Sequence, residues 1–204
     1  MNQQFEAAYW QARISSLWQP KVPVLPFIPT RNTPPARVLQ VSSSWRGIEN
    51  VLEEIMDRFH VPGHRCLEFG VEYGFSTAAL SSFFESTIGV DTFQGDIHTN
   101  NIKDIYAETV QNLSAFPDIQ LVKSDYQDYI RGNNETFDLI HVDIIHTYVD
   151  TFACGLWSAQ HSACTLFHDT ESFPYVKQAV ADIARATGKQ FYNLKDFYGF
   201  GIVV

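Results

Sequence analysis

Two stretches in the second half of the chain place aspartate and histidine directly after apolar, strand-like residues. FDLIHVDIIHTY contains Asp143 and His146, and TLFHDT contains His168 and Asp169. A carboxylate or an imidazole at the end of a buried strand costs free energy unless it is paired or bound. We expect the preceding His141 to pack or cap locally. The other four residues suit two kinds of chemistry, coordination of a metal ion and general acid–base catalysis.

A third stretch, CLEFGVEYGFSTAAL, has the pattern of a strand, a glycine-containing turn and the start of a helix. Gly70 and Gly74 allow the backbone to come close to a ligand and to take dihedral angles that other residues avoid. The GxxxG spacing differs from the GxGxxG of pyrophosphate-binding loops, and the charge of Glu68 would repel a pyrophosphate. That carboxylate instead suits a cationic ligand or a backbone N–H of the loop. A plain tight turn is the alternative.

Two further aspartates follow the next apolar runs of the sequence. Asp91 ends IGVD, about twenty residues after the glycine turn, where an acidic residue can accept both ribose hydroxyls of a nucleoside. Asp125 lies in LVKSDY, where it either contacts an adenine amino group or acts as a helix N-cap. Together with Glu68 they form an acidic group at strand ends that lacks a phosphate-binding feature. Such a group favours a positively charged adenosine compound without phosphate, which describes S-adenosylmethionine.

The elements that must position these residues alternate regularly from residue 64 onward. Short apolar runs predict strands, and the segments between them have helical patterns. This alternation predicts a parallel sheet with helices on both faces. Only KDFYG separates the last two runs, which is too short for a parallel crossover and therefore predicts an antiparallel hairpin. The seven expected strands are RCLEF (65–69), TIGVD (87–91), IQLVK (119–123), FDLIHV (137–142), ACTLFH (163–168), FYNL (191–194) and FGIVV (200–204).

Residues 1–60 differ from the rest of the chain. A helical apolar pattern covers 4–18, six of the nine prolines fall within the sixteen residues of PKVPVLPFIPTRNTPP, and SSSWRGIENVLEEIMDRF again has helical spacing. Prolines fix φ and remove N–H donors, so the middle stretch should run extended over a surface. We therefore expect an N-terminal extension at 1–60, made of a helix, a proline-rich strap and a helix. It would act as a cap or a dimer contact for one domain at 61–204.

The composition of the chain argues against several classes of binding partner. The chain has 204 residues and a formal net charge of −9. This acidic balance and the lack of a Lys/Arg cluster argue against a nucleic-acid partner. The three cysteines, Cys66, Cys154 and Cys164, lie among apolar neighbours and form no CxxC pair, which predicts buried thiols in a reducing compartment. Without a signal-peptide pattern or an apolar run of membrane length, we expect a cytoplasmic protein with no membrane partner.

Four motifs in order, EFGVEYGFS, VDTFQGD, HVDIIHTY and LFHD, carry a family resemblance. Residues 64–204 resemble the class I S-adenosylmethionine-dependent methyltransferases, and most closely the small O-methyltransferases of the macrocin and catechol type. The resemblance implies an α/β, Rossmann-like, doubly wound and mostly parallel seven-stranded sheet with a C-terminal antiparallel hairpin. It also implies S-adenosylmethionine as the cofactor, bound by residues of the first three strand ends: Glu68, Gly70, Gly74, Ser76, Asp91, Thr92 and Asp125.

In metal-dependent members of that group, an acidic residue after the fourth strand and a pair after the fifth bind a divalent cation. Asp143 matches the first position, and His168 with Asp169 matches the pair, which implies Mg²⁺ or Mn²⁺ at these residues. Ordinary strand-end polar groups without a metal are the alternative. His146 matches the base, because histidine titrates near neutral pH. The sequence departs from the pattern at Ile144, where glycine is usual, and at His168, whose nitrogen would shift preference toward manganese, iron or zinc.

The resemblance implies O-methylation of a small hydroxylated metabolite, either a sugar or a natural-product intermediate. A metal-independent methyltransferase that uses His146 or His168 as base is one alternative, and a cofactor-binding module without activity is another. A nicotinamide-dependent oxidoreductase is disfavoured by the missing GxGxxG and by the terminal hairpin. The sequence leaves the acceptor, the metal and the oligomeric state open, although the apolar strap is compatible with a homo-oligomer.

Overall fold

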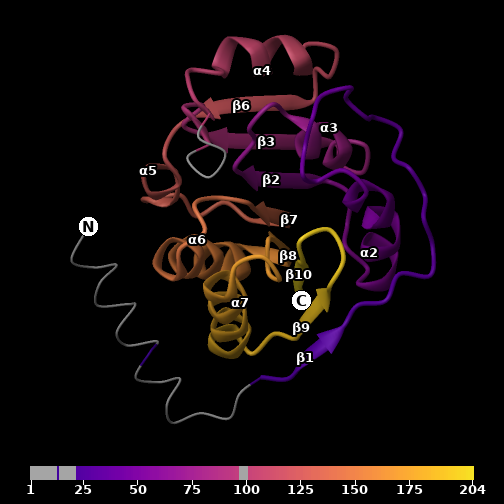
Figure 1. Cartoon of the computed structure of the whole chain (residues 1–204), viewed down its shortest axis with the longest axis vertical. Helices are drawn as coiled ribbons and strands as arrows, with labels where there is room; N and C mark the ends of the chain where they lie inside the picture. The colour runs from indigo at the N-terminus through magenta and orange to yellow at the C-terminus, as the bar shows by residue number, and fades with distance from the viewer. Residues whose placement is uncertain (1–12, 14–21, 97–100) are drawn as a thin grey trace. The chain divides into compact units, whose positions relative to one another are not determined.

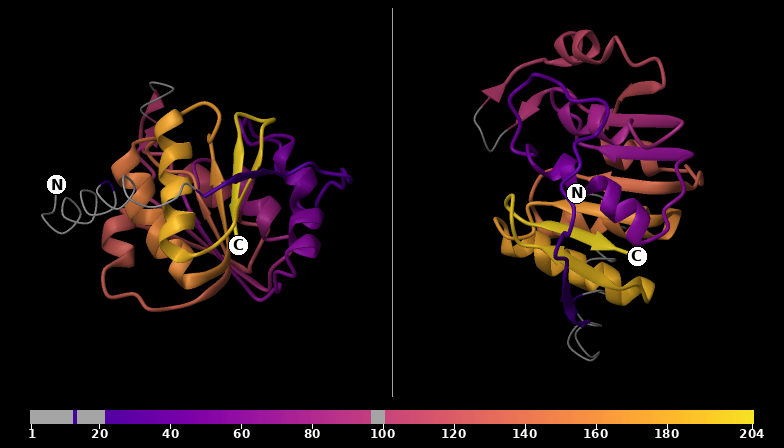
Figure 2. Two further views of the ribbon diagram at one scale, coloured as in Figure 1. Left: turned by 90° about the horizontal axis from the view of Figure 1, so that it is seen from below. Right: turned by 90° about the vertical axis from the view of Figure 1, so that its right-hand side faces the viewer.

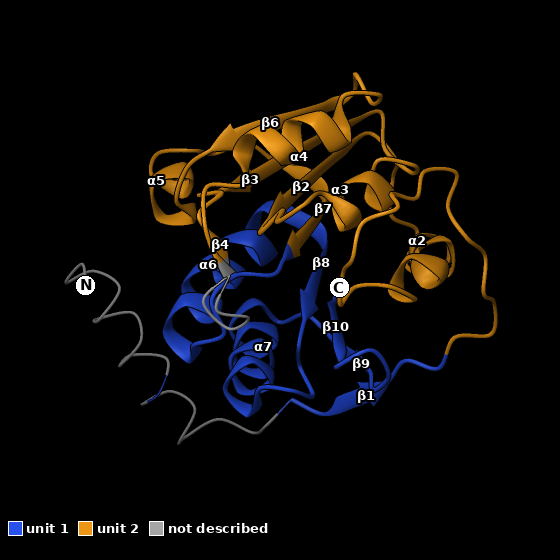
Figure 3. Ribbon diagram, turned by 45° about the horizontal axis from the view of Figure 1, so that its top comes forward, with its two compact units in different colours: residues 1–28, 142–204 blue, residues 29–141 orange. Residues whose placement is uncertain are grey.

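The computed structural model describes residue 13 and residues 22–96 and 101–204, which form two compact units (Figure 3). Unit 1 comprises residues 1–28 and 142–204, and unit 2 comprises residues 29–141. The helix expected at 4–18 lies outside the described residues apart from Arg13. Within the described ranges, no helix is long and apolar enough to cross a bilayer. The expected division into an extension at 1–60 and a domain at 61–204 stays a prediction.

Unit 2 is built on parallel strands with crossover helices between them (Figure 1). Strand β2 pairs in parallel with β3, and β3 pairs in parallel with β6, as the alternation of runs predicts. The strands are β2 (Arg65–Phe69), β3 (Ser86–Asp91), β6 (Ile119–Lys123) and β7 (Phe137–Val142), with a short antiparallel pair of β4 (Gly95–Asp96) and β5 (Asn101–Ile102). The helices are η1 (Ile48–Val51), α2 (Leu52–Arg58), α3 (Phe75–Leu80), α4 (Tyr106–Leu113) and α5 (Tyr126–Ile130).

Unit 1 contains the antiparallel part of the fold. Strand β10 (Phe200–Val203) runs antiparallel to both β9 (Phe191–Leu194) and β8 (Ser162–His168). The hairpin of β9 and β10 is the yellow pair of strands in Figure 2, and it confirms the prediction from the short KDFYG connection. The two helices are α6 (Tyr148–His161) and α7 (Pro174–Thr187), and α7 begins with a proline and ends at a left-handed glycine, Gly188.

The proline-rich strap contributes a strand that the sequence analysis did not predict. All seven expected strands are present, and β1 (Val24–Pro26) pairs in parallel with β9 in addition. The Phe27 N–H extends this ladder by donating to the carbonyl of Asn193 (2.9 Å), and its ring is buried. Because proline cannot donate to a ladder, a strand with prolines belongs at a sheet edge, which is where β1 lies.

The continuation of the strap in unit 2 is held by one buried carboxylate, that of Glu54 on α2. Its Oε2 accepts hydrogen bonds from the N–H groups of Thr30 (2.7 Å) and Arg31 (2.7 Å), and its Oε1 bonds Arg58. Burial alone would raise the pKa of Glu54, but these donors outweigh burial and lower the pKa. The extended chain at residues 30 and 31 therefore depends on an ionised side chain.

We predict that Glu54→Ala lowers the free energy of unfolding by about 2–4 kcal/mol, because two backbone donors and Arg58 lose a charged acceptor. Asp57→Ala is the matched control, since Asp57 pairs with Arg31 in an exposed salt bridge that should contribute at most about 1 kcal/mol. Urea denaturation of both variants measures the difference. Equal losses in the two variants would contradict the anchoring role of Glu54.

Candidate functional site

The four polar residues singled out after the fourth and fifth expected strands come together in unit 1. The Nε2 atom of His146 lies 3.0 Å from a carboxylate oxygen of Asp169 and 3.5 Å from one of Asp143. The Nδ1 atom of His168 lies 3.1 Å from Asp143 and 3.3 Å from Asp169. Each imidazole therefore contacts both carboxylates, so the four residues form one cluster.

The donor atoms of this cluster fit a divalent cation. Asp143, His146 and Asp169 each offer one ligand atom, and these atoms lie within 4.8 Å of one another. An octahedral ion with bonds of about 2.1 Å places neighbouring donors about 3 Å apart. Two carboxylates with one imidazole form a mixed oxygen and nitrogen set, which suits manganese, iron or zinc better than magnesium. The set includes His146, whereas the sequence pattern assigned the nitrogen ligand to His168.

The carboxylates control the protonation of both histidines. Burial alone would lower the pKa of His146, but hydrogen bonds and attraction to Asp143 and Asp169 raise its pKa to about 9. Burial alone would also lower the pKa of His168, but the same two carboxylates raise it to about 10. Burial raises the pKa of Asp169, yet bonds from both imidazoles hold it at about 2. Without a bound cation His146 is protonated at neutral pH, in contrast to the expected titration near neutrality.

The backbone at Asp169 is unusual and is held by the C-terminal hairpin. Asp169 has φ +62°, in the left-handed region that few residues other than glycine adopt. In the loop that follows, the Thr170 N–H donates to the carbonyl of Gly199 (3.3 Å) and the Glu171 N–H donates to the carbonyl of Tyr198 (2.9 Å). Gly199 has φ +92°, and a Cβ there would lie 2.2 Å from the Glu171 nitrogen. The tip of the hairpin therefore fixes the loop that carries Asp169.

In unit 2, Asp91 organises the glycine turn. Its Oδ2 accepts hydrogen bonds from the N–H groups of Val71 (2.8 Å) and Glu72 (2.9 Å), and its Oδ1 accepts one from the Phe93 N–H (2.7 Å). A carboxylate has about four lone-pair positions, and the three backbone donors occupy about three of them. The expected binding of ribose hydroxyls by Asp91 stays a prediction.

Glu68 lies in a buried chain of polar contacts. One oxygen of Glu68 bonds the Thr77 hydroxyl, and the other lies 2.9 Å from Nδ1 of His141. The indole N–H of Trp45 lies 3.3 Å from Nε2 of His141. Because an indole can only donate, Nε2 accepts this hydrogen bond, and the N–H at Nδ1 donates to Glu68. Glu68 and His141 are fully buried, so the bonds between them are shielded from water.

The other predicted cofactor residues occupy the same unit. Gly70 and Gly74 both have φ +89°, as expected for a turn that needs glycine. Ser76 is buried in the first turn of α3, and the hydroxyl of exposed Thr92 lies 3.5 Å from Asp91. Asp125 caps α5 by accepting from the Gln127 N–H (2.7 Å), which is the second of its two expected roles. A cofactor role for these residues stays a prediction.

Comparison with known proteins decides the family. The methyltransferase domain matches residues 67–170, which is half of the chain. The chain belongs to the methyltransferase family. A comparison with curated protein sequences found no match.

Solved structures show that this methyltransferase has the class I, Rossmann-like fold. A Klebsiella pneumoniae protein assigned as an O-methyltransferase is 15% identical with a TM-score of 0.57, over 81% of this chain and 82% of that one. The S-adenosylmethionine-bound amino pentose methyltransferase of calicheamicin biosynthesis, from Micromonospora echinaspora, is 11% identical with a TM-score of 0.57, over 79% and 92%. A Staphylococcus aureus protein assigned as a caffeoyl-CoA O-methyltransferase is 13% identical with a TM-score of 0.59, over 99% and 92%.

Sequence reasoning missed several residues that position the cluster in unit 1 of the methyltransferase. The ring of Phe173 stacks on His146 with centroids 4.2 Å apart. The buried amide of Asn193 accepts from the Thr170 hydroxyl (2.6 Å) and donates to Glu171 (2.6 Å). Asn193 is a polar residue in the apolar run FYNL, and this was the only indication of its role in the sequence. No sequence pattern indicates the stacking of Phe173 on His146.

The raised pKa values predict how the stability of the methyltransferase depends on pH. Both imidazoles bind protons more tightly in the folded protein, so their contribution is fully present below about pH 6.5 and is lost as the pH rises through 9 and 10. We expect the free energy of unfolding, measured with urea in chelator, to fall between pH 7 and pH 10. Asp143→Asn removes one cause of the raised pKa values, so this variant should lose less stability over that range. An equal slope in parent and variant would contradict the assignment.

Proposed function

We propose that this methyltransferase transfers the methyl group of S-adenosylmethionine to a hydroxyl group of a small metabolite, with the help of a divalent cation such as Mg²⁺ or Mn²⁺. The observation that supports this proposal is the cluster of Asp143, His146 and Asp169, whose ligand atoms lie within 4.8 Å of one another. Hydroxyl groups are poor nucleophiles until they lose their proton, so an acceptor hydroxyl needs a base or a nearby positive charge. The cluster contains groups for both tasks.

The comparisons support the choice of oxygen as acceptor only together with the cluster. Two of the three neighbours described above are assigned as O-methyltransferases, but the same fold occurs in the N-methyltransferase NodS of Bradyrhizobium japonicum. A neutral amine already has a nucleophilic lone pair and needs no cation. The carboxylates of Asp143 and Asp169 would add little to amine methylation, which is why we favour a sugar or natural-product hydroxyl.

Unit 2 would bind the cofactor. The turn at Gly70 and Gly74 has the positive φ values that glycine permits, and the remaining lone pair of Asp91 can accept one ribose hydroxyl. Bound S-adenosylmethionine supplies an electrophilic methyl group on its sulfonium. Ser76, Thr92 and Asp125 complete the proposed set, and Glu68 supports the turn from inside the unit.

Unit 1 would activate the acceptor. Asp143 and Asp169 would hold the cation, and His168 would orient both carboxylates through Nδ1. A divalent cation supplies positive charge that polarises the hydroxyl and replaces the positive charge of the imidazolium groups. In this proposal His146 would not coordinate the cation but would accept the hydroxyl proton at Nε2, held in place by its stacking on Phe173.

A metal-independent methyltransferase is the second candidate function, and one observation favours it. The protons on His146 and His168 already offset the charge of two carboxylates, so the cluster is balanced without a cation. In that reaction a neutral form of His146 or His168 would act as base, and activity would rise with pH toward the pKa values of about 9 and 10.

A binding experiment with Mn²⁺ separates these two candidates. Asp143→Asn and Asp169→Asn should each weaken Mn²⁺ binding at least about tenfold, since each removes a charged ligand. Asp196→Asn is the matched control, because Asp196 is an exposed acid in the β9–β10 loop and should leave affinity unchanged. His146→Gln should retain Mn²⁺ while lowering kcat. Absence of Mn²⁺ binding to the parent protein at millimolar concentration would contradict the cation and favour the second candidate.

The cofactor site has its own test, because S-adenosylhomocysteine can be titrated without an acceptor. Asp91→Ala should weaken its binding by about tenfold to hundredfold, since hydrogen bonds to a charged acceptor contribute about 1.5–3 kcal/mol. Asp128→Ala removes an exposed acid of α5 in the same unit and should bind as the parent does. Calorimetry gives both dissociation constants. An Asp91→Ala variant with parental affinity would contradict the role of Asp91.

A further inference from the structure

The glycine turn of unit 2 is held on its carbonyl side by helix α4, which the proposed function does not use. The Thr109 hydroxyl lies 2.6 Å from the carbonyl oxygen of Glu72, and the Asn112 amide donates to the carbonyl of Tyr73 (3.1 Å). Asp91 binds the N–H groups of the same turn. The turn therefore has side-chain partners for both its donors and its acceptors.

The bond from Thr109 to the turn is specific. A hydroxyl has one proton to donate, and two carbonyl oxygens are near it, Glu72 at 2.6 Å and Ile105 at 3.1 Å. The Ile105 carbonyl already accepts the Thr109 N–H within the helix (3.0 Å). The shorter contact directs the proton to Glu72. Thr109 is fully buried, so water does not compete for that proton.

The residue that Thr109 holds is strained. Glu72 has φ +51°, a left-handed conformation that costs a residue with a Cβ about 1–2 kcal/mol. Its N–H is bound by Asp91 (2.9 Å) and its carbonyl by Thr109 (2.6 Å). Because the strain favours relaxation to negative φ, the turn keeps its shape only while both peptide groups of Glu72 are held.

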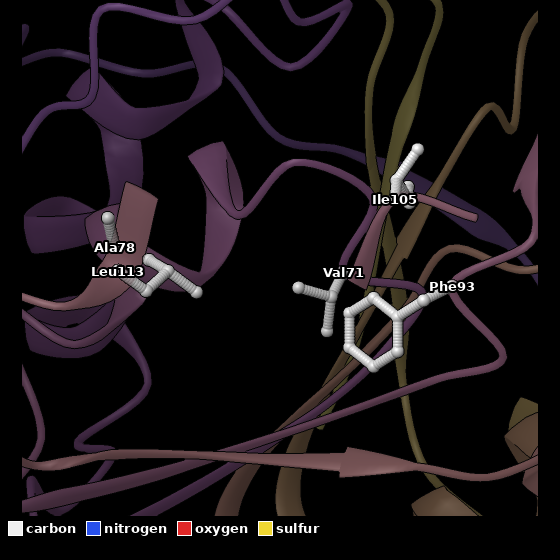
Figure 4. Close-up of a cluster of buried hydrophobic side chains, with 5 residues drawn as sticks. All are labelled: Val71, Ala78, Phe93, Ile105 and Leu113. Atoms are coloured by element: carbon white, nitrogen blue, oxygen red, sulfur yellow. The ribbon is translucent and has the colours of Figure 1, made fainter. Parts of the chain in front are cut away.

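Helix α4 is itself fixed against the turn by apolar packing. Val71 from the turn and Leu113 from α4 belong to one buried cluster with Ala78, Phe93 and Ile105 (Figure 4). A Cβ added to Gly74 would lie 2.8 Å from the Leu113 side chain, so turn and helix are in close contact. The donors of α4 therefore sit on a rigid support.

We propose that Thr109 and Asn112 are positioning residues for the cofactor, which keep the glycine turn in the shape that binds S-adenosylmethionine. This inference rests on the proposed function of unit 2. Neither side chain needs to touch the cofactor, because each acts through a carbonyl of the turn. When the turn spends only a fraction of its time in the competent shape, the apparent dissociation constant rises by the inverse of that fraction.

The test titrates S-adenosylhomocysteine into the full-length protein and its variants by calorimetry. Thr109→Val removes the hydroxyl at nearly constant volume and should raise the dissociation constant about fivefold to tenfold, and Asn112→Ala should raise it by about fivefold. Thr109→Ser keeps the hydroxyl and should bind as the parent does. Gln111→Ala, at an exposed position of α4, is the matched control and should have no effect.

A second substitution separates positioning from general stability. Glu72→Gly removes the strain at the left-handed residue, so it should restore most of the affinity that Thr109→Val loses. A loss of fold stability alone would leave the dissociation constant of the folded protein unchanged. Amide hydrogen exchange without ligand should show faster exchange at residues 71 and 72 in Thr109→Val than in the parent. If Thr109→Val folds poorly, Asn112→Ala alone must show weaker binding.

Each outcome decides a different claim. A parent protein that does not bind S-adenosylhomocysteine overturns the proposed function, and this inference with it. A parent that binds, together with Thr109→Val and Asn112→Ala variants of parental affinity, overturns the positioning role alone. Weaker binding of Thr109→Val without rescue by Glu72→Gly also overturns it, because the lost affinity would then not come from the conformation of the turn.

Discussion

Two carboxylates that share their partners need positive charge beside them, and unit 1 is arranged around this constraint. Asp143 and Asp169 are both contacted by His146 and by His168, at distances of 3.0 to 3.5 Å. Isolated, such a pair would lose one charge by protonation. Here the imidazoles take up the protons instead, which raises their pKa values and lowers that of Asp169. Under the proposed function, a divalent cation, which has the same charge as two imidazolium groups, would take their place.

In unit 2, the carboxylate of Asp91 has a different role from the pair in unit 1, because it binds the backbone. Its carboxylate is bonded by three backbone N–H groups and needs no counter-ion. Those donors come from the turn after β2 and from the second residue after β3, so the bonds tie two strand ends together. Thr109 and Asn112 then bind the carbonyl side of the turn. One acid in this methyltransferase therefore organises the backbone, whereas the pair in unit 1 contacts two imidazoles.

Structural features that depend on a local sequence pattern were predicted, whereas features that depend on contacts between residues far apart in the chain were missed. All seven strands and the hairpin followed from apolar runs and from the length of KDFYG. The four-residue cluster followed from strand ends that carry polar groups. The pairing of β1 with β9 was not predicted, because prolines interrupt the sequence pattern of a strand. The raised pKa of His146 depends on Asp169, 23 positions away, and such a contact has no periodicity to reveal it.

Part of the N-terminal region supplies hydrogen-bond partners to buried groups of unit 2. Residues 1–60 read as an extension, yet the indole of Trp45 fixes the tautomer of His141, which in turn bonds the buried Glu68 beside the glycine turn. Thr30 and Arg31 similarly satisfy the buried carboxylate of Glu54. Without these partners, unit 2 would contain buried polar groups with unmet hydrogen bonds, at a cost of about 1–3 kcal/mol each. The part of the region from residue 29 onward therefore supplies partners to buried polar groups of unit 2. The role of residues 1–60 as a cap or a dimer contact stays a prediction.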